Sequence, residues 1–103
     1  MTKDRLDKVL QAFDYPCAWG LFKTPQVPPY VIYDNGNSRN VYSDERILKT
    51  IDSFEIELYH NDYAERLKFE NYLTQSGIIW QRFVSDTYIS SEDVFQSIYE
   101  VVR

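Results

Sequence analysis

The segment from Ile51 to His60 constrains the fold of this 103-residue chain more than any other stretch. Three large apolar residues alternate in it with two glutamates and a tyrosine, namely Phe54, Ile56 and Leu58 with Glu55, Glu57 and Tyr59. Because successive side chains of a strand point to opposite faces, this alternation predicts a strand with one apolar face. Such a strand is typical of an antiparallel or mixed sheet with one face in water.

Two segments are predicted to form helices. In the first, Thr2 is a suitable N-cap, and apolar residues recur at helical spacing at Leu6, Val9, Leu10 and Phe13. Pro16 ends this helix, because the residue before a proline avoids the helical region. The second helix begins at Asn61 or Asp62 and ends at Gly77, a good residue for a helix C-terminus. We expect the first helix to pack on the sheet face of Phe54, Ile56 and Leu58.

The remaining segments carry strand and turn signals. Strands are predicted at 17–23, 30–33 and 78–84, with a turn at 85–87 and a proline-rich extended connection at 24–29. The last segment, 94–102, fits a helix or a strand, and its Val, Ile, Phe and Tyr residues favour the strand. The sequence therefore predicts one α+β domain over residues 1–103, with a mixed, mostly antiparallel sheet and two helices packed on one face.

A turn signal stands at Asp34-Asn35-Gly36-Asn37. Asn-Gly tolerates the positive φ angles of a type I′ turn, so we expect a hairpin that returns through 38–42. The segment 43–50 is polar and ambiguous. With little apolar surface in 35–49, we expect this stretch to be flexible in a free monomer.

Composition excludes several classes of function. The net charge is −5 and no two basic residues are adjacent, so the chain lacks the basic stripe of nucleic-acid and anionic-membrane binders. One cysteine allows no internal disulfide, and Met1–Asp4 is not an apolar secretion signal, so we expect synthesis in the cytoplasm. The nine tyrosines either edge the core or serve a protein interface.

Three groups of residues are candidates for a catalytic or metal-binding site. Cys17 with His60 as its base would make a cysteine nucleophile, but no neighbouring cation lowers the pKa of the thiol. His60 with Glu57 and Asp62 is one imidazole with carboxylates, which is not a closed metal site. Glu55 and Glu57 share one strand face, whereas a hydrolase uses carboxylates that face each other across a cleft. We therefore expect no catalytic residue, no cofactor and no metal, and we expect Cys17→Ser and His60→Ala to leave function intact.

Several segments together resemble a family of phage and prophage proteins encoded among the head–tail joining and tail genes. The resemblance lies in the order and spacing of Tyr15–Phe22, Pro28–Tyr33, Ile56–Tyr59, Glu70–Leu73 and Ile98–Val102, and spans nearly the whole chain. These proteins are the tail terminator, or tail-completion, proteins of long-tailed phages. The resemblance implies a tail-terminator-like α+β fold.

The resemblance also implies a structural role in the virion, at the head–tail junction. Such proteins form a ring, commonly a hexamer, that caps the tail tube and contacts the head connector. The implied partners are further copies of the chain, the tail-tube protein and the head connector proteins. The family has no catalytic residues to carry over. A small ligand-binding or regulatory α+β domain is the alternative, and other head–tail joining roles stay open.

Residues for a subunit interface are predicted on the second helix and in the proline-rich connection. Tyr63 and Leu67 lie on the side of that helix away from Phe69 and Leu73, so we expect them to contact another subunit. Because ring interfaces join two different patches, we expect a second patch at a strand edge or in the connection, at Pro28 and Pro29.

Overall fold

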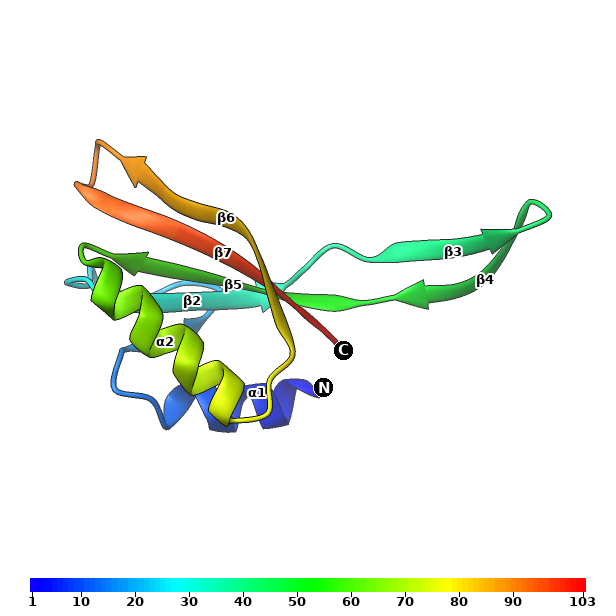
Figure 1. Ribbon diagram of the computed structural model, residues 1–103, viewed down its shortest axis with the longest axis horizontal. Coiled ribbons are helices and arrows are strands. Elements are labelled where there is room, and N and C mark those ends of the chain that lie inside the picture. Colours follow the sequence, from blue (N-terminus) through cyan, green and yellow to red (C-terminus); the bar gives the residue numbers. More distant parts are fainter.

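The computed structural model describes residues 1–103 as two helices and seven strands (Figure 1). In chain order these are α1 (Lys3–Gln11), β1 (Cys17–Trp19), β2 (Tyr30–Asn35), β3 (Arg39–Ser43), β4 (Arg46–Ile51), β5 (Ser53–His60), α2 (Tyr63–Gln75), β6 (Trp80–Ile89) and β7 (Val94–Val102). The predicted α+β class is confirmed.

Five strands form the main sheet, in the order β1-β2-β5-β7-β6, and β3 and β4 form a separate pair. Within the main sheet β1 pairs with β2 in parallel and all other neighbours are antiparallel, so the sheet is mixed as predicted. Both helices lie on the same face of this sheet, which leaves its other face without a covering layer (Figure 1).

The core lies between the helices and the sheet. Phe54, Ile56 and Leu58 of β5 are buried there together with Leu6 and Leu10 of α1, as the alternation predicted. Phe69, Leu73 and Tyr99 complete the centre of the core. Phe13 lies at its margin, half-buried and stacked on the Tyr72 ring at 4.4 Å.

Local chemistry sets three of the helix ends as predicted, whereas α1 ends at Gln11, five residues before Pro16. The Thr2 side chain accepts a hydrogen bond from the Arg5 backbone N–H at the start of α1. Asp62 caps α2 in a capping box with Glu65, whose side chain accepts from the Asp62 backbone N–H. After α2 the chain passes through Gly77 at φ 77°, a left-handed conformation that suits glycine.

The structure shortens one predicted strand and lengthens another. The strand predicted at 17–23 ends at Trp19, because Gly20 takes φ 80° and turns the chain away. The turn predicted at 85–87 is wrong, since β6 continues to Ile89 with two register irregularities, and Asp86 lies within the second of them at φ 49°. The last segment is strand β7, the alternative favoured by its residue types.

The hairpin prediction at Asn35-Gly36 is also wrong. The chain does not reverse there, because Gly36 continues the pairing of β2 with β5 by donating its N–H to the Ser53 carbonyl at 2.9 Å. It runs on into β3 and reverses at Asp44 and Glu45, which take φ 50° and 63°. Residues 35–49, expected to be flexible, therefore contain most of two strands that pair with each other.

Candidate functional site

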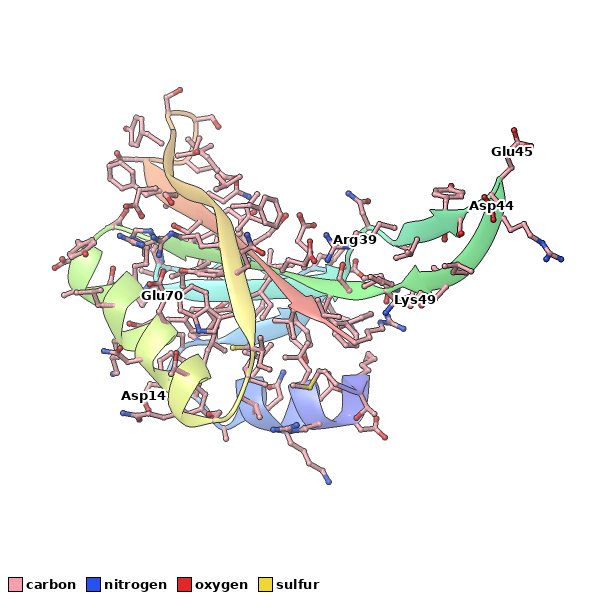
Figure 2. All side chains as sticks on the ribbon, turned by 45° about the vertical axis from the view of Figure 1, so that its right-hand side comes forward. Asp14, Arg39, Asp44, Glu45, Lys49 and Glu70 are labelled. Atoms are coloured by element: carbon pink, nitrogen blue, oxygen red, sulfur yellow. The ribbon has the colours of Figure 1, made fainter.

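The pair β3–β4 projects from the body as an arm, here defined as residues 39–51 (Figure 1). Every residue of the arm is exposed except Ile51, and the arm contributes to a longest dimension of 49 Å for the molecule. Figure 2 shows Asp44 and Glu45 at its tip and Arg39 and Lys49 between the tip and the body. The arm thus presents both of its faces to solvent.

Pairing between the strands gives the arm a basic face. Arg39 is opposite Ile51, Val41 is opposite Lys49, and Ser43 is opposite Arg46. Residues 39, 41 and 43 share one face because they alternate along β3, and residues directly opposite one another share a face as well. The basic face therefore carries all three cations of the arm, with Val41 and Ile51 among them.

The other face of the arm combines apolar and polar groups. Tyr42 is opposite Ile47, and their side chains are 64% and 58% exposed. Thr50 donates a hydrogen bond to the Asn40 side-chain carbonyl at 2.6 Å. A bulge at Leu48, which is 66% exposed, interrupts the pairing. Such an accumulation of exposed apolar side chains on a slender element is typical of a contact surface.

The base of the arm is held by backbone contacts. The Ser53 hydroxyl is buried and donates to the Asn37 carbonyl at 2.8 Å, and the Arg103 N–H donates to the Asp52 carbonyl at 2.9 Å. A Cβ on Gly36 would meet the Ser53 side chain and the backbone of Ser53 and Phe54. These contacts fix the direction in which the arm leaves the sheet.

The uncovered face of the main sheet, here called the open face, carries a row of carboxylates. In the register of β2, β5 and β7, Asp34 is opposite Glu55, and Glu55 is opposite Glu100. Glu57 lies two residues further along β5 on the same face. Partial burial raises the pKa of Glu55, and the charges of Glu57 and Asp34 raise it further. Like charges directly opposite one another destabilise a sheet.

The chain supplies no cation to this row. None of the four carboxylates Asp34, Glu55, Glu57 and Glu100 lies within 4.0 Å of a Lys, Arg or His nitrogen. They also do not converge on a point where a metal ion could bind. Two shallow hollows of about 160 and 30 Å³ meet at Glu55, on either side of it. The row is thus suited to an extended cationic partner rather than to a single ion.

A second group of polar residues is buried beneath α2. Glu70 accepts from the Tyr99 hydroxyl at 2.7 Å and forms ion pairs with Arg66 at 3.2 Å and Arg82 at 2.5 Å. Figure 2 shows Glu70 pointing from α2 into the body. Burial raises the pKa of Tyr99, and its hydrogen bond to Glu70 raises it further. Every polar group in contact with Glu70 donates a hydrogen bond to it. The cluster therefore satisfies a carboxylate that is buried in the protein.

His60 belongs to the same buried region. Its Nε2 lies 3.0 Å from Asp86 Oδ1 and 3.5 Å from Ser97 Oγ, and its Nδ1 lies 3.2 Å from the Asp62 carbonyl. Asp86 also lies 3.2 Å from Arg66 Nε. In a nucleophile–base–acid relay, the serine and the carboxylate use opposite nitrogens of the imidazole. Here both approach Nε2, an arrangement that differs from such a relay.

Cys17 lies away from these clusters, on β1 at the start of the sheet. Its thiol is partly buried and donates to the Tyr15 carbonyl at 3.3 Å, and burial raises its pKa to about 12. A thiol with a raised pKa is a poor nucleophile at neutral pH. Glu55 and Glu57, weighed above as a carboxylate pair, instead form part of the row on the open face.

The predicted interface residues lie at two separate places. Tyr63 and Leu67 are on the outer side of α2, 58% and 40% exposed, and the Tyr63 ring contacts the Arg66 guanidinium at 4.7 Å. Pro28 and Pro29 are half-buried and lead directly into β2. Both places lie toward the same end of the sheet, because Tyr30, directly after Pro29, pairs with Tyr59 near the end of β5, and α2 begins at Tyr63. Their role in an interface stays a prediction.

Comparison with models of known protein families and with curated proteins gives no match to this chain. Neither helix is long and apolar enough to cross a lipid bilayer.

Proposed function

We propose that this chain is a structural subunit of a ring at the head–tail junction of a long-tailed phage, where it caps the tail tube and contacts the head connector. The arm is the observation that carries the proposal. A two-stranded hairpin is marginally stable by itself in water, and here neither face of it packs on the body. A neighbouring subunit would give the arm a surface on which to lie.

Two further features support a ring rather than a closed dimer. The arm lies at one end of the long axis, whereas Tyr63 and Leu67 lie on the outer side of α2 and Pro28 and Pro29 precede β2 (Figure 1). When two different patches of each subunit meet, every added copy leaves one patch free, and the series closes only as a ring. The separation between the arm at one end of the molecule and the Pro28–Pro29 connection at the other favours this heterologous mode.

The phage role rests on the resemblance of the sequence to tail terminator proteins. It is tested by deleting the gene from the phage or prophage genome that encodes it and examining the particles by electron microscopy. We expect heads and tails to accumulate unjoined, and a plasmid copy of the gene to restore joined particles. Joined particles without the gene would contradict the proposed function.

Ring formation is tested separately with the purified protein. Mass in solution and negative-stain images are expected to show rings, either free or after addition of isolated tail tubes. Leu67→Asp is expected to weaken them, because a carboxylate in a desolvated contact loses its hydration. A variant that folds and assembles like the wild type would remove Leu67 from the interface.

The alternative of a small ligand-binding domain has two hollows in its favour. One of about 240 Å³ lies next to the buried His60 and is below the usual volume range of ligand pockets. The other, of about 510 Å³, is open and is lined among others by Phe13, Lys68 and Tyr72, and its volume lies within that range. A protein that stays monomeric in both assays above, and that a small metabolite stabilises against heat, would favour this alternative.

A further inference from the structure

The arm and the open face carry opposite charge within the same chain. The arm holds three basic residues and two acidic ones, which leaves the body with eight basic and fourteen acidic residues and a net charge of −6. The two acidic residues of the arm, Asp44 and Glu45, form its tip (Figure 2). Every other charged residue of the arm is therefore a cation. Charge of opposite sign on two separate surfaces is the pattern expected of patches that meet between copies.

The dimensions of the two surfaces also agree. Neighbouring strands lie about 4.8 Å apart, so the row from Asp34 through Glu55 to Glu100 extends over about 10 Å. Along the arm, Arg39 and the Ser43–Arg46 pair are four residues apart, which corresponds to about 14 Å. An arm that crosses the strands of the sheet would place its three cations over the three carboxylates.

Both surfaces also carry apolar residues beside their charged ones. Val41 and Ile51 lie among the cations of the basic face, and on the open face Ile32 and Ile98 flank Glu57, two residues along β5 from Glu55. Ile32 and Ile98 are half-buried and have no layer above them. Contact between these residues would remove apolar surface from water on both partners.

We propose that the basic face of the arm of one copy lies across the open face of the next copy, with Arg39, Arg46 and Lys49 paired to Asp34, Glu55 and Glu100. The inference rests on the ring function proposed above and names one contact between neighbouring subunits of the ring. It also accounts for the carboxylate row, because the repulsion within the row is relieved only when the neighbouring arm arrives. The occupant of the open face is therefore a second copy of this chain.

Charge exchange between the two surfaces tests this contact. The arm variant carries Arg39→Glu, Arg46→Glu and Lys49→Glu, and the face variant carries Asp34→Lys, Glu55→Lys and Glu100→Lys. Each alone is expected to self-associate about 100-fold more weakly than the wild type, whether rings form in solution or on tail tubes. Mixed in equal amounts, the two are expected to assemble, because each arm then meets a face of opposite charge. A chain with all six changes is expected to assemble by itself.

A matched control variant has the same net charge as the arm variant, but the three cations that it replaces lie on the body. Arg5→Glu, Lys8→Glu and Lys23→Glu alter three exposed residues outside both surfaces. This control is expected to assemble like the wild type. If it is as defective as the arm variant, the effect comes from total charge and the proposed contact is wrong.

Neutral substitutions keep the test decisive if the face variant fails to fold. Asp34→Asn, Glu55→Gln and Glu100→Gln together are expected to raise the melting temperature of the monomer, because they remove like-charge repulsion. The same changes are expected to weaken self-association at least about tenfold. A role of the row in the monomer alone would not give these opposite effects.

The outcomes separate this inference from the proposed function. If the wild type assembles and the variants, singly and mixed, assemble equally well, the arm–face contact is overturned and the ring function stands. If the wild type forms no assembly in solution or on tail tubes, both are overturned. Wild-type assembly is further expected to weaken as salt rises, since exposed ion pairs are screened.

Discussion

The Tyr99 hydroxyl donates a 2.7 Å hydrogen bond to Glu70 Oε2, which joins the centre of β7 to the buried side of α2. Glu70 faces a tyrosine and two arginines, and it is one of the few charged residues that the fold buries. A buried carboxylate is tolerated only when its hydrogen bonds and charge are satisfied. The stability of the body should therefore depend on this residue.

Glu70→Ala is expected to destabilise the protein by about 3 kcal/mol, because the buried Arg66 would keep only Asp86 as a partner and the Tyr99 hydroxyl would lose its acceptor. Tyr99→Phe removes only the hydrogen bond and should cost about 1.5–3 kcal/mol. Urea unfolding followed by circular dichroism measures both. Tyr42→Phe, on the exposed arm, is the matched control and should have no effect on the unfolding of the body.

The tip of the arm should gain order from residues better suited to its backbone. Asp44 and Glu45 both have positive φ, which costs a residue with a Cβ about 1 kcal/mol. Asp44→Asn with Glu45→Gly creates the Asn-Gly pair that favours a type I′ turn. We expect amide hydrogen exchange in β3 and β4 to slow about fivefold. Faster exchange in this variant would contradict the turn geometry.

The base of the arm should be sensitive to a side chain at Gly36. Gly36→Val would place methyl groups against the side chain of Ser53 and the backbone of Phe54, and should cost about 1–3 kcal/mol. Ser53→Ala in the same chain should recover part of this loss, since the Ser53 hydroxyl is the nearest atom to the added Cβ. Equal unfolding free energies for Gly36→Val and the double variant would show that the clash lies with the backbone alone.

Stability should fall at alkaline pH. Burial raises the pKa of Tyr15, Tyr33 and Cys17 to about 12 each, above ordinary values of 10.0 and 9.0. The unfolded chain therefore releases these protons first, and the free energy of unfolding should decrease from about pH 9 to about pH 12. Urea unfolding at a series of pH values measures the slope. Tyr33→Phe should flatten it, and an unchanged slope would mean that Tyr33 does not contribute.

The features predicted correctly from the sequence are those that depend on neighbours in the chain. Asp62 caps α2 within its first turn, and the alternation of Phe54, Ile56 and Leu58 needs only the geometry of a strand. The sequence predicted a polar face on β5, but it did not predict a row of carboxylates across three strands. The alignment of Asp34, Glu55 and Glu100 depends on the pairing of three strands that are far apart in sequence.

The arm was mispredicted for a different reason. Asn35-Gly36 carries the stronger turn signal, but the pairing of β2 with β5 continues through Gly36 and outweighs that local preference. The turn forms instead at Asp44-Glu45, where Glu rarely adopts a positive φ. The pairing of β2 with β5 is set by its buried residues, and it carries both strands past Gly36 before the chain can reverse. Of the site residues, Tyr63 and Leu67 were correctly expected to be exposed.

The irregular pairing of β6 has a consequence for solubility. β6 is an outer strand of the main sheet, and outer strands offer unpaired backbone groups onto which other chains can stack without limit. Its two register irregularities bend the strand and break the regular row of donors and acceptors that a fibril needs. The fold thus resists amyloid-like growth along this edge, even where many copies are crowded together during their synthesis.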